Sequence, residues 1–258
     1  MFSLRYILFA CLPLIFTEAS YVFNHSPCSI KDNDCMIDLF QKVFHDLGEN
    51  GIADINLQPI DPMKISDLSI KVLDDLIIVI KDGVVKGFKN CKVNSFNIDL
   101  DKQLAIQEVA CEVLTIKGHF AIEGSNPLLQ SLFGTTSIKA EGKTKIKLEK
   151  ITFGLEVPVT VIIKDGNTYF KVLTNKPKYT YNIEKMTFEA KNFVIEKNDL
   201  SQIVTMYVNE NWKTLLKTYG KEIMDKAMYI VFDVIHKFYD FIDTKKLIKE
   251  DLTPYIHN

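Results

Sequence analysis

Arginine is almost missing from this chain. Arg5 is the only one, so 30 of the 31 basic residues are lysines, and the formal net charge is -2. Arginine is the side chain that grips phosphate and carboxylate groups through two parallel hydrogen bonds. Its scarcity and the near-neutral charge argue against a nucleic-acid-binding protein. With 47% apolar and 25% charged residues, the composition is that of a globular protein rather than a disordered one.

Sequence signatures of catalysis are missing too. The chain has no Gly-x-Ser-x-Gly nucleophile elbow, no His-Glu-x-x-His zinc motif and no glycine-rich phosphate loop. Its five histidines stand at no metal-ligand spacing from one another. We therefore expect a protein that is not an enzyme and that has no catalytic residue, no bound metal and no cofactor.

Long apolar runs are confined to the N-terminus. Arg5 precedes the apolar run 6–16, and Thr17-Glu18-Ala19 places small residues where a signal peptidase reads. The run is far shorter than the roughly 20 residues that span a bilayer, so a secretory signal peptide explains it better than a membrane anchor. We expect cleavage after Ala19, with signal peptide 1–19 and a single secreted, extracellular domain 20–258. Asn24, in Asn24-His25-Ser26, is then a candidate glycosylation site.

Cleavage leaves four cysteines, an even number that suits disulfides in an oxidising compartment. Of the three ways to pair them, local geometry favours Cys28 with Cys35 and Cys91 with Cys111. Structural zinc, the alternative use, wants ligands two to four residues apart in pairs, and these gaps are wider. Buried, unpaired thiols are the other alternative for the second pair.

The second pair also predicts a hairpin register. If Cys91 faces Cys111 across two antiparallel strands, the facing pairs of the hairpin are all apolar, as cross-strand stabilisation prefers. These pairs are Val93–Val109, Phe96–Ile106 and Ile98–Leu104. The apolar side of the ribbon changes along the hairpin, so we expect a strong twist or cover on both faces.

The mature chain begins with a pattern typical of a short amphipathic helix. Capping residues at 32–34 are followed by apolar residues at spacings of three and four, and Gly48 follows as a stop. The apolar residues are Met36, Leu39, Phe40, Val43 and Leu47.

A strand pattern replaces the helical one from about residue 68 to residue 195. Asp82-Gly83 and Asp165-Gly166 stand between apolar runs and predict two-residue hairpin turns. The clearest alternation runs from 138 to 148, with lysines at 139, 143, 145 and 147 on its other face. A solvated surface explains this lysine stripe most simply, and contact with an anionic membrane is the alternative.

Helical spacing returns over residues 200–243 and predicts one helix of about 66 Å, unless Gly220 bends or splits it. Its apolar face is too wide for a surface helix, so the sheet must wrap it. The interior is either a plain packed core or a cavity that suits an apolar ligand.

Three stretches together resemble the insect haemolymph juvenile-hormone-binding and takeout family. Cys28 and Cys35 precede a short helix, and Pro59-Ile60-Asp61-Pro62-Met63-Lys64-Ile65 is similar to the family's Pro-Leu-Asp-Pro-Leu-x-Ile connection. Near the C-terminus, Asn209-Glu210-Asn211-Trp212-Lys213 leads into the long helix much as in the family. The strand with Gly118-x-Phe120 and Gly124 looks like the family's Gly-x-Tyr…Gly strand.

The resemblance is to a divergent, takeout-like member. It implies an α+β fold, a tubular lipid-binding roll in which a strongly curved antiparallel sheet wraps a long C-terminal helix and a short helix stands at the N-terminus. It also implies a carrier that binds juvenile hormone, another terpenoid, a fatty acid or a related lipid non-covalently in an internal tunnel.

The expected partner is thus one small hydrophobic ligand, with transient membrane or receptor contact as a secondary expectation and no nucleic acid. We favour a monomer. From their positions on apolar faces, eight side chains are expected to line the tunnel: Phe40, Phe44, Tyr207, Trp212, Leu215, Tyr219, Ile223 and Phe238. The main alternative is a secreted membrane-surface or host-interaction protein that uses this fold without a specific ligand. A hydrolase of lipid esters is a third hypothesis.

Overall fold

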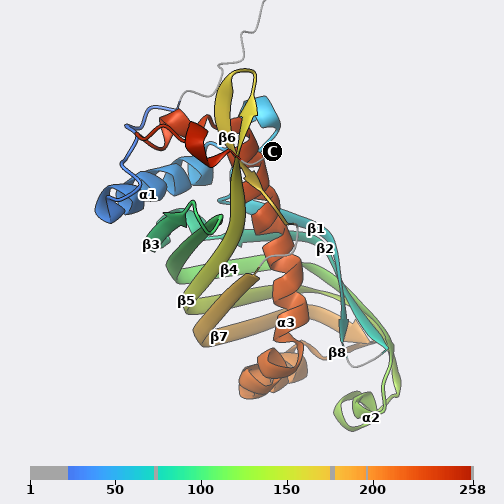
Figure 1. Ribbon diagram of the computed structural model, residues 1–258. Coiled ribbons are helices and arrows are strands. Elements are labelled where there is room, and N and C mark those ends of the chain that lie inside the picture. The colour runs from blue at the N-terminus through green and yellow to red at the C-terminus, as the bar shows by residue number, and fades with distance from the viewer. Residues whose placement is uncertain (1–22, 73–74, 175–177, 196, 257–258) are drawn as a thin grey trace, which may run out of the picture.

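One antiparallel sheet curls along a long helix, α3 (Ser201–Phe241), and a short helix, α1 (Asn33–Glu49), covers one end (Figure 1). The computed structural model describes residues 23–72, 75–174, 178–195 and 197–256. The predicted signal peptide and its cleavage site lie outside these residues. The predicted α+β class, with a long C-terminal helix against a curved sheet, is confirmed.

The strands and minor helices complete the fold. The strands are β1 (Met63–Val72), β2 (Leu76–Lys86), β3 (Lys92–Asp99), β4 (Leu104–Ser125), β5 (Ser137–Lys164), β6 (Asn167–Val172), β7 (Lys178–Ile195) and β8 (Asn198–Asp199). The short helices are η1 (Ala53–Ile55), η2 (Phe88–Asn90), α2 (Leu128–Phe133), η3 (Thr244–Lys246) and η4 (Thr253–Tyr255).

The sheet is closed by a helix rather than by a strand. Its order is β1-β2-β4-β5-β7-β8, with β3 added to β4 and β6 added to β5. Helix α3 packs on β7 and β6 and also on β1, at the far edge. Because β1 and β7 lie towards opposite edges, the sheet curls until α3 bridges them. The helix therefore runs along the concave side of the sheet (Figure 1).

Extra residues on the convex face help to bend the sheet. In β5 two residues, Glu149 and Lys150, separate the inward-facing Leu148 and Ile151, where strict alternation allows one. The neighbouring strands carry the same extra residue in the same row, in β4 between Cys111 and Leu114 and in β7 between Ile183 and Met186. Since all three strands insert a residue together, the pairing register is the same on both sides of the row. Extra residues of this kind bend a strand and increase its twist.

The extra residues are held on the outside by charge. Lys150 Nζ lies 3.2 Å from a carboxylate oxygen of Glu184, and Lys185 Nζ lies 3.1 Å from one of Glu149. Charged side chains favour the solvent side. The sequence thus decides which residues face outward at the bend.

Helix α1 begins where the sequence predicts. The Asp32 side chain accepts a hydrogen bond from the amide of Cys35 at 3.1 Å, and the Cys28–Cys35 disulfide ties this turn to the preceding segment. The five predicted apolar residues are all buried. The predicted stop at Gly48 is wrong, because the helix continues to Glu49 and Gly48 lies buried against Lys89.

The Cys91–Cys111 disulfide is confirmed, but only part of the hairpin register is right. Val93 pairs with Val109, after which an irregularity between Val93 and Ser95 shifts the strands by one residue. The predicted pairs Phe96–Ile106 and Ile98–Leu104 are wrong: Phe96 faces Gln107 and Ile98 faces Ala105. The extra residue explains why the apolar side of the ribbon changes, because it returns Phe96 and Ile98 to the buried face.

Of the two predicted hairpin turns, one is confirmed. Asp165 and Gly166 have φ of 51° and 80° and connect β5 to β6, as a tight turn with two left-handed residues requires. The turn at Asp82-Gly83 is wrong, because both residues lie inside β2, next to an irregularity that follows Ile80. Here β4 comes so close that a Cβ on Gly118 would lie 2.4 Å from the Asp82 carbonyl oxygen.

Candidate ligand-binding site

Two separate apolar cores lie along α3. The large core gathers α1, β3, β6 and the C-terminal half of α3, from which it takes Met224, Met228 and Phe232. The small core lies near α2 and includes Phe120, Ile138 and Phe193, with Leu200, just before α3, and Val204 of α3 packed against it. Helix α3 therefore has a packed region at each end.

Between these cores α3 presents apolar side chains that pack against neither of them. They are Val208, Trp212, Leu215, Leu216 and Tyr219, all of them only partly buried. The other side of the helix carries exposed Lys213, Thr214, Lys217 and Thr218. We call the five apolar residues the open stretch. They form an apolar face of the helix that belongs to neither core and stays partly accessible.

The concave face of the sheet is lined by small residues at the boundary between the two cores. Gly118 in β4 pairs with Thr144 in β5, and Gly142 lies two residues away. A Cβ on Gly142 would lie 3.2 Å from the Phe120 ring, whereas larger inward residues such as Ile116 and Ile146 adjoin the large core. We call Gly118, Gly142 and Thr144 the small band. The Thr144 hydroxyl is buried and has no hydrogen-bond partner among the described residues.

Polar side chains fix how α3 is rotated against the sheet. Asn209 donates to the Phe188 carbonyl and accepts from its amide, both at 2.8 Å. Earlier turns repeat the contact at 2.9 Å, where Thr205 accepts from the Ala190 amide and Ser201 from the Phe193 amide. These residues recur every four positions, so one line of the helix is hydrogen-bonded along β7. The apolar open stretch is thereby held beside the concave face.

Gly220 lets the helix approach β7 more closely. A Cβ there would lie 2.6 Å from the Tyr181 hydroxyl oxygen and 2.9 Å from a Leu216 methyl carbon. The helix is nevertheless continuous from Ser201 to Phe241, so of the two possibilities that the sequence leaves open, the unbroken helix is the one found.

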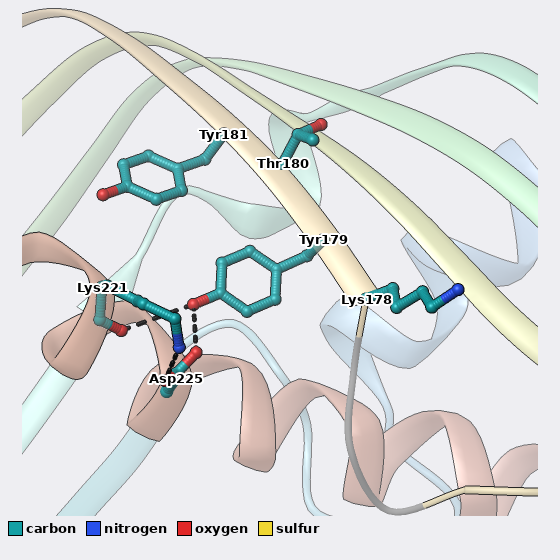
Figure 2. Close-up of a pocket in the computed structure, with 6 residues that line it drawn as sticks. All are labelled: Lys178, Tyr179, Thr180, Tyr181, Lys221 and Asp225. Carbon is teal, nitrogen blue, oxygen red and sulfur yellow. Dashed lines mark hydrogen bonds and ion pairs between the residues drawn. The ribbon is translucent and has the colours of Figure 1, made fainter.

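A cleft of about 500 Å³ opens between β7 and α3 at this level. Figure 2 shows the rings of Tyr179 and Tyr181 reaching from the strand towards the helix, with centroids 6.3 Å apart. The Tyr179 hydroxyl donates to Asp225 at 2.5 Å, and Lys221 Nζ donates to the same carboxylate at 2.6 Å (Figure 2). The rim of the cleft is thus polar, while its floor is aromatic.

These contacts shift the pKa values of two side chains at the rim of the cleft. Burial, followed by the hydrogen bond to Asp225, raises the pKa of Tyr179 well above its usual value. The hydrogen bonds from Lys221 and then from Tyr179 lower the pKa of Asp225. Tyr179 therefore stays protonated and Asp225 stays ionised near neutral pH.

The eight side chains predicted to line a tunnel fall into two groups. Trp212, Leu215 and Tyr219 belong to the open stretch, with the partly buried Tyr207 and the 38% exposed Ile223 at its two ends. The other three lie in or against the large core: Phe40 stacks on Phe96 at 3.6 Å, Phe238 is 4% exposed, and Phe44 packs against the core. The structure does not bring all eight together.

Sequence reasoning missed two parts of this site. Val208 and Leu216 belong to the same helical face, and Leu216 already stands in the apolar stripe of the sequence. Two members of the small band could have been noticed in the sequence. Gly142 and Thr144 interrupt the apolar alternation of residues 138–148, because glycine has no side chain and threonine is polar. A small residue on the inward face of a strand weakens the strand. It also indicates a place where a ligand or another segment of backbone can come close.

Within the described ranges, no group of three or more His, Cys, Asp or Glu side chains could hold a metal ion. None of the helices in this part of the chain is both long and apolar enough to cross a membrane. Asn24 is exposed in the segment before α1, and its glycosylation remains a prediction.

Comparison with known proteins agrees with this architecture. Residues 7–249 match the family model described as haemolymph juvenile hormone binding protein. The chain belongs to this family. The description of the family refers to the binding of juvenile hormone by its haemolymph members.

Two relatives bear on the comparison. The juvenile hormone-binding protein of Manduca sexta is 29% identical over 116 residues, which cover 44% of this chain and 49% of that one. The chain thus matches about half the length of this curated relative. The crystal structure of Takeout 1 from Epiphyas postvittana superposes with a TM-score of 0.73 at 20% identity, and covers 88% of this chain and 100% of that one. At this identity the likeness concerns the fold alone.

Proposed function

We propose that this protein is a secreted carrier that holds one small hydrophobic molecule, without a covalent bond, between the open stretch of α3 and the small band of the sheet. The observation that carries the proposal is the open stretch itself. Its five apolar side chains are partly buried and pack against neither core, on a helix that runs along the concave side of the sheet. Apolar surface left without packing partners is costly, and an apolar ligand removes that cost.

The lining favours an apolar molecule with few polar groups. The wall combines aliphatic and aromatic side chains with two glycines, and none of these residues is charged. The unpartnered hydroxyl of Thr144 and the hydroxyl of Tyr219 are the groups that would orient a carbonyl, ester or hydroxyl of the ligand. Juvenile hormone, another terpenoid, a fatty acid or a related lipid has this chemistry, and the name of the Manduca sexta relative supports the choice.

The cleft beside Tyr179 and Tyr181 is our choice for the ligand entrance. It opens between β7 and α3 at the end of the open stretch nearest Gly220, and its floor is aromatic. We further propose that the chain is exported and loses residues 1–19, since the two disulfides suit an oxidising compartment.

The direct test is the mass of the protein secreted from insect cells, measured natively and after denaturation. We expect a native excess of a few hundred daltons that denaturation removes. Displacement of the fluorescent probe N-phenyl-naphthylamine by farnesol, juvenile hormone and oleic acid then ranks the ligand classes. A native mass without excess, together with no probe binding, would contradict the proposal.

Two matched variants locate the site. Leu215→Trp adds volume to the open stretch and should weaken probe binding by about tenfold or more, because the larger ring occupies the proposed space. Thr214→Trp adds the same ring on the exposed side of the same helical turn and should leave binding unchanged. Equal losses in both variants would place the ligand elsewhere.

A further inference from the structure

The convex face of the sheet, on the side away from α3, carries closely spaced exposed lysines. Lys117 in β4 faces Lys145 in β5 directly, and Lys143 faces both His119 and Lys191. Like charges directly opposite on neighbouring strands are destabilising. On its other side Lys145 faces Glu189 of β7, so one acid lies within this group of lysines.

The acids of this region already have other partners. Asp82 accepts from His119 at 2.7 Å, Glu141 pairs with Lys81 at 2.5 Å, and Glu189 pairs with Lys191 at 2.9 Å. Among the described residues, Lys86, Lys117, Lys143 and Lys145 make no ion pair. All four are exposed, and we call them the lysine face. The whole chain has a net charge of -2, so this positive surface is a local concentration.

Apolar side chains continue the same surface along β2 and β4. Ile77 is 45% exposed, and it lines a shallow cleft of about 300 Å³ with Val79 and Ala121. Asp75 and Glu123 complete the outer end of this cleft, where Glu123 pairs with Lys139 at 3.2 Å. Beyond Val79 and Ala121 on this face, His119 pairs with Asp82, and Lys81 is the extra residue beside this pair, so the apolar strip adjoins the region that carries the lysines. One surface therefore offers ammonium groups and apolar groups side by side.

We propose that the lysine face and the strip Ile77–Val79–Ala121 form a docking surface for a lipid membrane that contains anionic headgroups. Lysines near an anionic bilayer are attracted to its headgroups, and exposed apolar groups gain by entering the interface. An anionic polysaccharide would use the lysines but would gain little from the apolar strip. The surface is separate from the open stretch, so docking does not require the ligand-binding proposal to be right.

The test is flotation of the full secreted chain with phosphatidylcholine vesicles, prepared with and without phosphatidylserine. We expect binding only to the vesicles that contain phosphatidylserine. The binding should fall as salt is raised, because exposed charges are screened over about 8 Å at physiological ionic strength. No binding of the wild type to anionic vesicles would overturn the proposal, as would equal binding to both vesicle types.

Charge reversal distinguishes an effect of the lysine face from an effect of the overall net charge. The triple variant Lys117→Glu, Lys143→Glu and Lys145→Glu should lower partition onto anionic vesicles by about tenfold or more. The control variant Lys171→Glu, Lys217→Glu and Lys226→Glu changes the net charge equally, at exposed lysines elsewhere, and should bind like the wild type. Equal losses in the two variants would contradict the proposal. Circular dichroism and probe binding, unchanged in both, confirm that fold and ligand site are intact.

A last pair of variants distinguishes lipid from polysaccharide. Ile77→Ser should weaken vesicle binding and leave retention on heparin unchanged, while Ile163→Ser, at a 57% exposed isoleucine of the β5–β6 hairpin, should change neither. A wild type that is retained on heparin but does not float with vesicles would assign the lysine face to a polysaccharide and overturn the membrane proposal.

Discussion

The two halves of α3 carry apolar residues of the same kinds but use them differently. In the C-terminal half Met224, Met228 and Phe232 are almost completely buried in the large core. In the N-terminal half Trp212, Leu215 and Tyr219 are only partly buried and pack against neither core. One helix thus serves stability at one end and, in our proposal, ligand binding at the other. Substitutions that are similar in chemistry should therefore have different consequences in the two halves.

The largest expected effect is in the large core. Phe232→Ala removes a ring that is 2% exposed and should lower the free energy of unfolding by about 3–5 kcal/mol. Leu215→Ala in the open stretch should cost about 1 kcal/mol or less, because that side chain is already poorly packed. Urea unfolding of the ligand-free proteins measures both. Similar costs would show that the two halves are equally packed.

Next comes the buried Cys91–Cys111 disulfide, which belongs to the large core. The double variant Cys91→Ala and Cys111→Ala should lose about 3 kcal/mol of stability, because the unfolded chain regains the entropy of an open loop. Probe affinity should be retained at a temperature at which the variant is folded, since the disulfide does not touch the open stretch. Loss of affinity in the folded variant would argue against a division of roles.

The third effect is smaller and is a gain in stability, which we expect from a substitution in the small band. Thr144→Val keeps the shape of the side chain and removes a buried hydroxyl that has no hydrogen-bond partner in the described part of the chain. We expect the ligand-free protein to gain about 1 kcal/mol in thermal or urea unfolding, because an unsatisfied buried hydroxyl is costly. Probe ligands with a carbonyl or hydroxyl should bind more weakly, while a pure hydrocarbon should not. A destabilised variant would show that the hydroxyl is satisfied in solution.

The smallest effect is expected at the exposed rim of the cleft. The pKa of Asp225 is lowered in the folded protein from its ordinary value of 3.8, so its stabilising effect is present above that value and is lost as the pH falls through the lower, folded pKa. Asp225→Asn should therefore lower the melting temperature slightly at pH 7, by the equivalent of less than about 1 kcal/mol, since the pair is exposed. Melting curves of the variant and the wild type should converge on acidification. A difference that grows towards low pH would contradict this assignment.

Much of the fold could be predicted from sequence because its signals are local. The helical stripe of α3, the apolar positions of α1, the two disulfides and the Asp165-Gly166 turn all depend on residues close together in the chain. The curvature could not be predicted, because the extra residues near Glu112, Lys150 and Glu184 acquire meaning only when three strands are aligned in one row. The predicted hairpin register is wrong beyond Val93 for a related reason. The extra residue near Asn94 can be recognised only when the two strands of the hairpin are aligned.

The site was predicted less well than the fold. Apolar helical periodicity selects a face, and it found Trp212, Leu215 and Tyr219. It cannot tell a face that is packed from one that is left open, so Phe40 and Phe238 were grouped with them although both are buried in the large core. That distinction depends on what lies opposite the helix, which in our proposal is the small band, and helical periodicity carries no information about it.

The side chains that anchor α3 also bear on self-association. A free sheet edge offers a row of amide and carbonyl groups on which another chain can add a strand. Along β7 that row is already occupied between Phe188 and Phe193 by Asn209, Thr205 and Ser201, and at the opposite edge the amide of Lys71 donates to Glu222 at 3.2 Å. The long helix thus covers both edges of a strongly curved, open sheet, and this cover opposes aggregation by strand addition.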